Sequence, residues 1–235
     1  MKLQGSREIA EGTMAFYFEK PKGFSFEPGQ FSTLTLLHPP QTDVEGDSRT
    51  FSIASAPHEP DLMFATRMRD TSFKRVLKSL AAGTEVDLDG PYGHLTLHKD
   101  AARPAVFLAG GIGITPFRSI ITDAARRALP HHMILFYSNR RPEDAAFLDE
   151  LVAGEKINPR YKFVGTMAEM KKSRQPWNGE RGFISREMLA RHIENLAAPV
   201  YYTAGPPAMV AAMEKMLRAA GVAGDDIRME RFSGY

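Results

Sequence analysis

The chain has 235 residues and a formal net charge of +2, with 43% hydrophobic and 25% charged residues. It contains no cysteine, which excludes disulfides, thiolate nucleophiles and cysteine-ligated zinc or iron–sulfur clusters. The mild charge does not favour binding to nucleic acid. The sequence shows no signal peptide and no long apolar run, so we expect a cytoplasmic globular protein without a membrane segment. Without cysteine, any redox chemistry of this protein needs a bound cofactor.

The first hundred residues have the pattern of short strands separated by turns such as PKGFSFEPGQ and HPPQTDVEGDS. One helix is predicted at 73–80, where apolar residues share a face behind Ser72 as N-cap. The GPYG segment at 90–93 is interpreted as a turn between strands. This pattern predicts a small antiparallel β-barrel. Its strands are expected at 1–9, 13–19, 30–37, 49–55, 61–67, 85–89 and 94–97.

Strands and helices alternate after the KDAARP segment at 99–104, which is interpreted as a linker. Such alternation predicts a parallel sheet with helical crossovers, the doubly wound α/β fold that binds nucleotides. We therefore expect two domains, 1–100 and 101–235. In the second, strands are expected at 105–110, 133–138, 161–167, 200–205 and 227–232, and helices at 115–128, 144–153, 185–192 and 206–220.

The segment FLAGGIGITPF carries an apolar strand into Gly110, Gly111 and Gly113 and then into a helix. Glycines let the backbone approach a phosphate, Thr115 can cap the helix, and Pro116 suits its first turn. Exposed N–H groups and the helix dipole then favour an anion. The pattern is not G-x-G-x-x-G, so a purely structural turn is the alternative, but the order of strand, glycines and helix favours nucleotide binding.

The segment RTFS places a cation, an aromatic ring and two hydroxyls in four consecutive residues. On a strand, Arg49 and Phe51 point to one face while Thr50 and Ser52 point to the other. A ligand along the strand edge could meet both sets. An ordinary half-buried strand with solvated polar residues is the alternative.

Three motifs, in this order, resemble those of the ferredoxin–NADP⁺ reductase superfamily. RTFS is similar to its flavin motif R-x-[YF]-[ST], GGIGITPF to its nicotinamide-nucleotide loop, and GPPAM to its C-G-P-x-x-M segment. The resemblance covers nearly the whole chain and includes no iron–sulfur domain. It implies an FAD-dependent reductase that passes electrons from NADPH to a separate carrier such as ferredoxin or flavodoxin, or in reverse. A reductase that feeds an oxygenase or reduces a small molecule, and a non-catalytic flavin-binding subunit, are the alternatives.

The resemblance also implies roles for residues around the flavin. Arg49 would meet the pyrophosphate, Phe51 would pack on the flavin, and Ser52 would hydrogen-bond near its N5 and assist hydride transfer. Arg69 and Asp70 stand where the family has a glycine, which leaves the phosphate donors open. The other implied flavin contacts are Thr50, Thr66, Arg67, Met68, Thr71 and Ser72.

For the nicotinamide nucleotide, the resemblance points to the glycine loop, the segment after the next strand, and GPPAM. Two arginines precede the first acid, Glu143, in FYSNRRPED, which favours the 2′-phosphate of NADP over NAD. A solvated loop and NAD binding are the alternatives, and no metal is expected. The implied contacts are Gly111, Gly113, Ile114, Thr115, Pro116, Ser138, Arg140, Arg141, Gly205, Pro206 and Met209.

Two features concern the region where the two cofactor rings would meet. Ala204 occupies the place where relatives carry a cysteine beside the nicotinamide, so ring positioning, but not hydride transfer itself, should differ. The final strand is expected to deliver Phe232 to the carboxyl edge of the sheet. Relatives ending in an aromatic residue imply that Tyr235 stacks on the flavin. A solvent-exposed terminus is the alternative.

Overall fold

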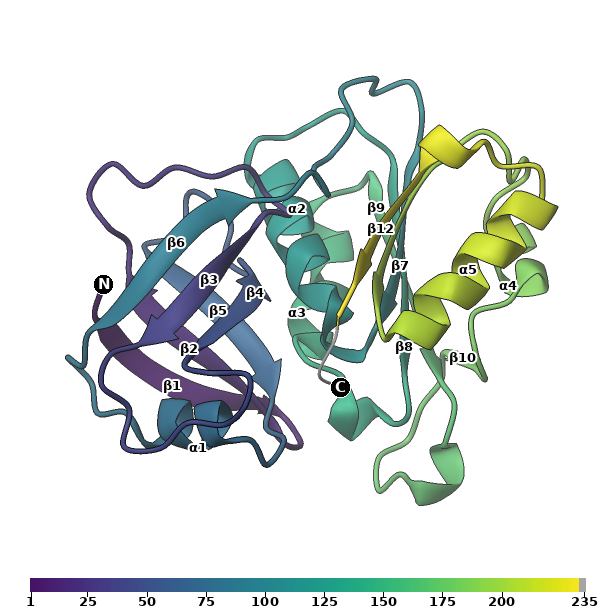
Figure 1. Cartoon of the computed structure of the whole chain (residues 1–235). Helices are drawn as coiled ribbons and strands as arrows, with labels where there is room; N and C mark the ends of the chain where they lie inside the picture. Colours follow the sequence, from purple (N-terminus) through teal and green to yellow (C-terminus); the bar gives the residue numbers. More distant parts are fainter. Residues whose placement is uncertain (233–235) are drawn as a thin grey trace.

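The computed structural model describes residues 1–232 and has two parts that lie side by side (Figure 1). The strands of the first part are β1 (Leu3–Ala10), β2 (Thr13–Glu19), β3 (Phe31–Leu36), β4 (Ser48–Ser52), β5 (Asp61–Arg67) and β6 (Val86–Tyr92). In the described chain they form two three-stranded antiparallel sheets, ordered β1-β2-β5 and β4-β3-β6. The sheets enclose a core that includes Phe16 and Phe64, and α1 (Ser72–Ser79) adds Phe73 to it.

Alternating burial explains why these segments form sheets around one core. Along β3, Ser32, Leu34 and Leu36 are buried while the residues between them are half-buried. A strand with this period covers a core with one face only. The predicted antiparallel barrel is confirmed.

Three local predictions in this part are wrong. The GPYG segment is not a turn between strands, because β6 continues to Tyr92, which pairs with Phe31 at a ring-centroid distance of 6.1 Å. No strand forms at 94–97. Cross-strand packing of two aromatic rings outweighs the turn preference of glycine and proline here. The N-cap of α1 is Thr71, whose hydroxyl accepts the capping hydrogen bond, and not Ser72.

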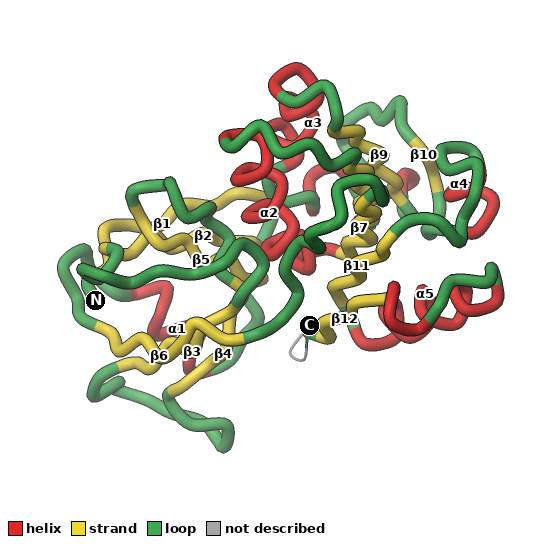
Figure 2. Tube along the Cα trace, turned by 90° about the horizontal axis from the view of Figure 1, so that it is seen from above, coloured by secondary structure: helices red, strands yellow, loops and turns green. Residues whose placement is uncertain are grey.

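The second part is a parallel sheet covered by helices on both faces. Its strands are β7 (Ala105–Gly110), β8 (Met133–Asn139), β9 (Tyr161–Met167), β10 (Glu180–Arg181), β11 (Val200–Gly205) and β12 (Ile227–Arg231), and its helices are α2 (Thr115–Arg126), α3 (Leu148–Ile157), α4 (Arg186–Ala190) and α5 (Pro207–Ala219). Over residues 1–232 the strand order is β10-β9-β8-β7-β11-β12. Figures 1 and 2 show α2 and α3 on the face towards the barrel and α4 and α5 on the other. The predicted doubly wound fold is confirmed.

The segment before α3 differs from the predicted helix at 144–153. A short 3₁₀ turn covers Pro142–Asp144, and Phe147 adopts a left-handed φ of 59°, so α3 begins only at Leu148. Positive φ is unfavourable for an aromatic residue, and this residue interrupts the regular helix. The strand β10 was not expected from the sequence.

The two parts share a packed interface. Ala54 and Met63 of the first part lie in one apolar cluster with Phe117 of α2. Arg118, also on α2, is buried and donates to the Ala54 carbonyl at 2.8 Å and to both carboxylate oxygens of Glu59, at 2.8 and 3.0 Å. This interface fixes the barrel against the α2–α3 layer. None of the helices in the described chain is long and apolar enough to cross a membrane.

Candidate functional site

A cavity of about 900 Å³ opens between the barrel and the carboxyl edge of the parallel sheet. In a doubly wound sheet this edge is where ligands bind. Segments far apart in the sequence contribute to its wall, and eight of the predicted contacts meet there. These eight are Arg67, Met68, Gly111, Ser138, Arg140, Arg141, Pro206 and Met209.

Glycines at the cavity floor and directly behind it permit close packing of the two turns. A Cβ added at Gly113 would lie 2.2 Å from the Ala204 carbonyl oxygen, and one at Gly110 would lie 2.2 Å from the Met209 sulfur. Gly111 has a φ of 52°, and Gly205 a φ of 149° that a side chain would strain. The β7 and β11 turns therefore form a floor of bare backbone, as close approach to a phosphate requires.

Four of the predicted nucleotide contacts lie behind this floor, outside the cavity wall. Gly113, Ile114, Thr115 and Pro116 are all buried. Thr115 was expected to cap α2, but this is wrong: its hydroxyl donates to the Ile112 carbonyl at 3.0 Å, which closes the short 3₁₀ turn before the helix. Pro116 lies in the first turn of α2, as predicted. These residues shape the turn and do not face the cavity.

The two predicted phosphate-binding arginines differ in their surroundings. Arg141 donates to both carboxylate oxygens of Asp144, at 3.0 and 2.9 Å, and pairs with Glu11 of the first part at 3.3 Å. Arg140 reaches Asp144 only at 3.3 Å, and 59% of its side chain is exposed. Burial alone would raise the pKa of Asp144, but the Arg141 hydrogen bonds and the nearby Arg140 and Arg67 lower it. Arg141 is thus held within the protein, while Arg140 is free to reach a ligand.

The predicted flavin residues of β4 lie beside α1. Arg49 and Phe51 share one face, as strand alternation predicts, since the Arg49 guanidinium lies 5.1 Å from the Phe73 ring centroid and the Phe51 ring 5.9 Å from it. Thr50 is exposed on the opposite face, with its hydroxyl 3.2 Å from that of Thr33. The ring of Phe51 therefore contacts the barrel core.

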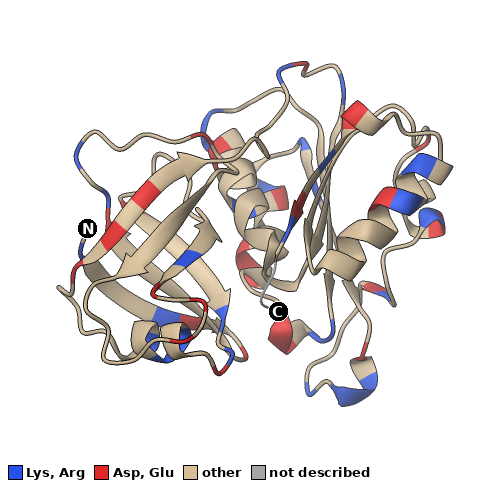
Figure 3. Cartoon of the chain, viewed as in Figure 1, with Lys and Arg blue, Asp and Glu red and all other residues tan. Residues whose placement is uncertain are grey.

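Positive charge gathers where β4 meets α1, and Figure 3 shows Lys and Arg segments on this helix. Burial, followed by the proximity of Arg69 and Arg49, lowers the pKa of Lys74 to about 8. Burial is the larger cause, and the added effect of the two arginines shows that Lys74 lies close to other cations. An anion bound here would offset the repulsion among them.

Two buried polar atoms near the predicted meeting point of the rings lack partners. The Ser52 hydroxyl and one carboxylate oxygen of Glu230 are buried and find no hydrogen-bond partner among residues 1–232. Burial raises the pKa of Glu230 to about 7, and its strand β12 pairs it with Ala204. A buried polar atom without a protein partner can take one from a ligand or from an ordered water. Ser52 was predicted from its motif. Glu230 was missed, because nothing in IRMERF tells which of its charges is buried.

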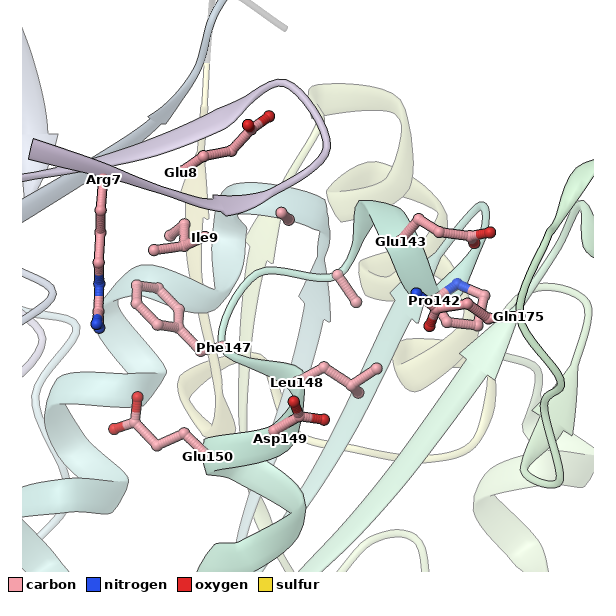
Figure 4. A pocket seen from close by; sticks show the side chains of 12 residues that line it. Arg7, Glu8, Ile9, Pro142, Glu143, Phe147, Leu148, Asp149, Glu150 and Gln175 are labelled. Carbon is pink, nitrogen blue, oxygen red and sulfur yellow. The ribbon is translucent and has the colours of Figure 1, made fainter.

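Figure 4 shows a second, smaller hollow of about 410 Å³. Ile9 enters it from β1, and Phe147 and Leu148 from the start of α3. Two of its carboxylates are already engaged: Glu150 pairs with Arg118 at 2.7 Å, and Glu143 accepts the Arg174 N–H at 2.6 Å. We interpret this hollow as part of the interface and place the candidate site at the larger cavity.

Phe232 lies at the same edge of the sheet. The Phe232 N–H donates to the Gly205 carbonyl at 3.0 Å, directly beside the glycine turn, and its ring packs against the shared core. Tyr235 lies outside the described residues.

The residues present fit a flavin and a nicotinamide nucleotide. The orphaned Ser52 hydroxyl offers a hydrogen bond to a buried ligand, and the cations around Arg49 suit phosphate. The bare glycine floor suits a second diphosphate.

Comparison with known proteins agrees with this geometry. Residues 107–215 match the family model described as "Oxidoreductase NAD-binding domain". Ferredoxin–NADP reductase B of Sorangium cellulosum is 29% identical over 98% of this chain and 96% of its own length. Reductase component 2 of terephthalate 1,2-dioxygenase from Comamonas is 26% identical over 90% of this chain, which spans only 61% of that protein.

A solved structure supports the fold across both parts. The ferredoxin NADP⁺ reductase from Neisseria gonorrhoeae, with bound FAD and NADP, superposes with a TM-score of 0.81 at 23% identity, covering 98% of this chain and 96% of that one. The two-part fold of this chain thus recurs in a solved structure over nearly its whole length. Residues 107–215 thus match an NAD-binding oxidoreductase domain, and along nearly its whole length the chain is similar to a ferredoxin–NADP reductase.

Proposed function

We propose that this chain is an FAD-dependent NAD(P)H reductase that delivers electrons to a separate redox protein. The observation that carries the proposal is the cavity between the two parts, where the glycine floor of the sheet faces Arg67 and Met68 of the barrel. Bound FAD would accept a hydride from the nicotinamide and release the electrons singly, chemistry that no side chain of this chain supplies. In this proposal 1–100 is the FAD-binding domain and 101–235 the NAD(P)-binding domain.

Residues of the barrel would hold the flavin. Arg49, Lys74 and the first N–H groups of α1 would bind its diphosphate, because they combine fixed cations with a helix N-terminus. Ser52 would donate its unpaired hydroxyl to the ring system. Phe51 would contribute an aromatic edge beside it. The further contacts proposed are Thr50, Thr66, Arg67, Met68, Thr71 and Ser72.

Residues of the sheet would hold the nicotinamide nucleotide. The turns at Gly111 and Gly205 would receive the diphosphate, and Arg140 would pair with the 2′-phosphate of NADP. Phe183, at the cavity wall with 79% of its surface exposed, offers a ring for adenine to stack on. We therefore propose NADP over NAD as the preferred nucleotide.

One side chain near the cofactor rings would orient the flavin, and another would hold or release a proton. Ser52 would orient the flavin through its hydroxyl without changing its own protonation. Glu230 has a pKa near 7, so its carboxyl can hold or release a proton under neutral conditions. Ala204, which is fully buried, pairs with Glu230 between β11 and β12.

For the electron acceptor we propose a ferredoxin or flavodoxin. The relative that matches this chain along nearly its full length is named as a ferredoxin–NADP reductase. Several longer relatives are named as reductase components of oxygenases, so an oxygenase component is the second candidate. NADPH-dependent reduction of purified ferredoxin or flavodoxin supports the first, and reduction of an oxygenase component alone supports the second.

The proposal is tested by adding FAD to flavin-free protein. We expect stoichiometric binding with quenched flavin fluorescence, and weaker binding of FMN because it lacks the diphosphate and adenosine. Equal affinity for FMN would contradict the proposed role of the diphosphate site.

Replacement of Ser52 with alanine tests the flavin-facing hydroxyl. We expect unchanged or slightly higher stability, because the variant removes an unsatisfied buried hydroxyl, and flavin reduction by NADPH slower by roughly tenfold, because one oriented hydrogen bond is lost. Ser32→Ala is the matched control, since Ser32 also has a buried, unpartnered hydroxyl on the neighbouring strand. Stopped-flow reduction that is equally fast in wild type and Ser52→Ala would refute the assignment.

Separate replacement of Arg140 and Arg141 tests nucleotide choice. Arg140→Ala should raise the KM for NADPH by about tenfold or more and leave that for NADH nearly unchanged, because it removes a charged phosphate contact. Arg141→Ala should mainly lower the melting temperature, since it leaves the buried Asp144 without its bidentate partner. Steady-state kinetics and thermal unfolding distinguish the two. A wild-type preference for NADH would contradict the role given to Arg140.

The pH dependence of FAD binding tests Lys74. Its pKa in the free protein is about 8, and a bound anion raises that pKa, so FAD binding should take up a proton above this value. Affinity should be constant below about pH 7 and fall as pH rises through 8, by at most about tenfold per unit. Calorimetry in buffers of different ionisation heat measures the uptake, and Lys74→Met should abolish it. Wild-type affinity that does not fall between about pH 7 and 9 would argue against a lysine in the site.

A further inference from the structure

A carboxylate of this chain lies in the anion cradle between β4 and α1. Asp43 accepts a hydrogen bond from Arg49 Nη2 at 2.8 Å through one oxygen and from the Ser72 N–H at 3.2 Å through the other. Arg49 and the first N–H groups of α1 are the donors proposed above for the flavin diphosphate. Asp43 therefore makes the contacts that phosphate oxygens would make.

The segment around Asp43 also engages the rest of the Arg49 guanidinium. We call residues 43–46 the strap. Its carbonyls at Glu45 and Gly46 accept from Arg49 Nη1 at 3.0 and 3.1 Å, and the Glu45 carboxylate lies 3.2 Å from Nε. The Ser48 carbonyl, in β4, accepts from the same Nη1 at 2.8 Å. Only 16% of the Arg49 side chain is exposed. The strap and the Ser48 carbonyl thus engage all three nitrogens of the Arg49 guanidinium, and the Phe73 ring centroid lies 5.1 Å from its central carbon.

The strap does not neutralise the whole cradle. Lys74 stays close enough to Arg49 and Arg69 for its pKa to be depressed. Asp43 itself keeps 27% of its side chain exposed, and its carboxylate gives one negative charge where a diphosphate gives two. A diphosphate therefore has the charge needed to displace Asp43 and additionally to pair with Lys74.

We propose that Asp43 is a built-in competitor of the flavin diphosphate, so that the strap must leave Arg49 and the N-terminus of α1 before FAD binds. The inference rests on the proposed FAD site and adds a residue that sets its affinity. Only molecules with an open strap bind FAD, so the apparent affinity is the intrinsic affinity multiplied by the fraction of molecules in which the strap is open. Asp43 thereby controls how readily the flavin is loaded and released.

The test compares Asp43→Asn with Asp47→Asn. Both substitutions remove one negative charge from the same loop, but the Asp47 carboxylate contacts the Ser48 hydroxyl and makes no contact with Arg49. For Asp43→Asn we expect the Kd for FAD, measured by flavin fluorescence on flavin-free protein, to fall about fivefold or more and the association rate to rise. Asp47→Asn should stay within about twofold of wild type. Unchanged or weaker FAD binding by Asp43→Asn, or an equal gain in both variants, overturns the proposal.

A second measurement separates this inference from the proposed function. Inorganic pyrophosphate titrated into flavin-free protein should bind Asp43→Asn more tightly than wild type, because the probe needs the cradle alone. If neither protein binds FAD, the proposed function fails, and the pyrophosphate result still decides the role of Asp43. Equal pyrophosphate affinity in the two proteins overturns it. Circular dichroism and melting temperature confirm that both variants are folded.

Discussion

Alanine in place of Arg49 is expected to weaken FAD binding by roughly tenfold to a hundredfold. A hydrogen bond to a charged group contributes about 1.5–3 kcal/mol, and about 1.4 kcal/mol corresponds to a factor of ten in affinity. The substitution removes the guanidinium and leaves Asp43 at the N-terminus of α1, where its negative charge opposes a phosphate. The loss should therefore lie towards the upper end of this range.

Fluorescence titration of flavin-free protein measures this effect, and Lys78→Ala is its control. Lys78 is an exposed cation in the last turn of the same helix, so its removal changes the net charge equally but not the cradle. A double-mutant cycle with Asp43→Asn adds a finer test. If Asp43 acts by occupying Arg49, its removal should help FAD binding less when Arg49 is already absent. Equal affinities of Arg49→Ala and Lys78→Ala would remove Arg49 from the site.

A methyl group at Gly113 is expected to damage both the fold and nucleotide binding. The added Cβ would lie 2.2 Å from the Ala204 carbonyl oxygen and 2.6 Å from the Gly205 nitrogen, and neither backbone atom can move without separating β7 from β11. Overpacking of this kind costs about 3 kcal/mol, which lowers the melting temperature of a protein of this size by roughly 6–12 °C. NADPH affinity should fall with it, because the floor of the cavity is displaced.

Gly5→Ala is the matched control for this prediction. A Cβ at Gly5 meets nothing within 4 Å, so the same chemical change should leave the melting temperature within about 2 °C of wild type. Thermal unfolding and NADPH titration of the three proteins measure both effects. A Gly113→Ala protein with wild-type stability and nucleotide affinity would show that the turn is not constrained as the geometry requires.

The sequence predicted the architecture and part of the cavity wall because both depend on local patterns. Alternation along β3 and the change to strand–helix alternation after 104 each reflect the period of one element. The glycine turn and GPPAM lie directly after strands, and parallel strands bring their carboxyl ends to one edge. Residues such as Gly111 and Met209 could therefore be assigned to one site without knowing any contact.

What the sequence could not predict are contacts between loops. Asp144 follows the two arginines closely, yet only the 3₁₀ turn at Pro142–Asp144 directs its carboxylate back to Arg141 and so separates the roles of Arg140 and Arg141. The burial of Glu230 depends on the packing around β12, which strand alternation alone does not specify.

The contact of Asp43 with Arg49 and α1 is the clearest case of this limit. Asp43 lies in a turn-rich segment whose sequence is typical of a solvent-exposed polar loop, and its partner Ser72 is distant along the chain. The error at GPYG has the same origin, because pairing with Phe31 extends β6 through residues that favour a turn. In each case a tertiary contact overrides a local preference.

The central claim is that NADPH reduces a flavin held by this chain, and anaerobic mixing of the FAD-loaded protein with NADPH tests it most directly. The measured quantity is the visible absorption of the bound flavin over time, with NADH in a parallel experiment. The account predicts that an equimolar amount of NADPH bleaches the flavin within seconds, that NADH does so more slowly, and that an added oxidised acceptor protein restores the colour. A bound flavin that stays oxidised with both nucleotides would contradict it and would leave the chain a flavin-binding protein without reductase activity.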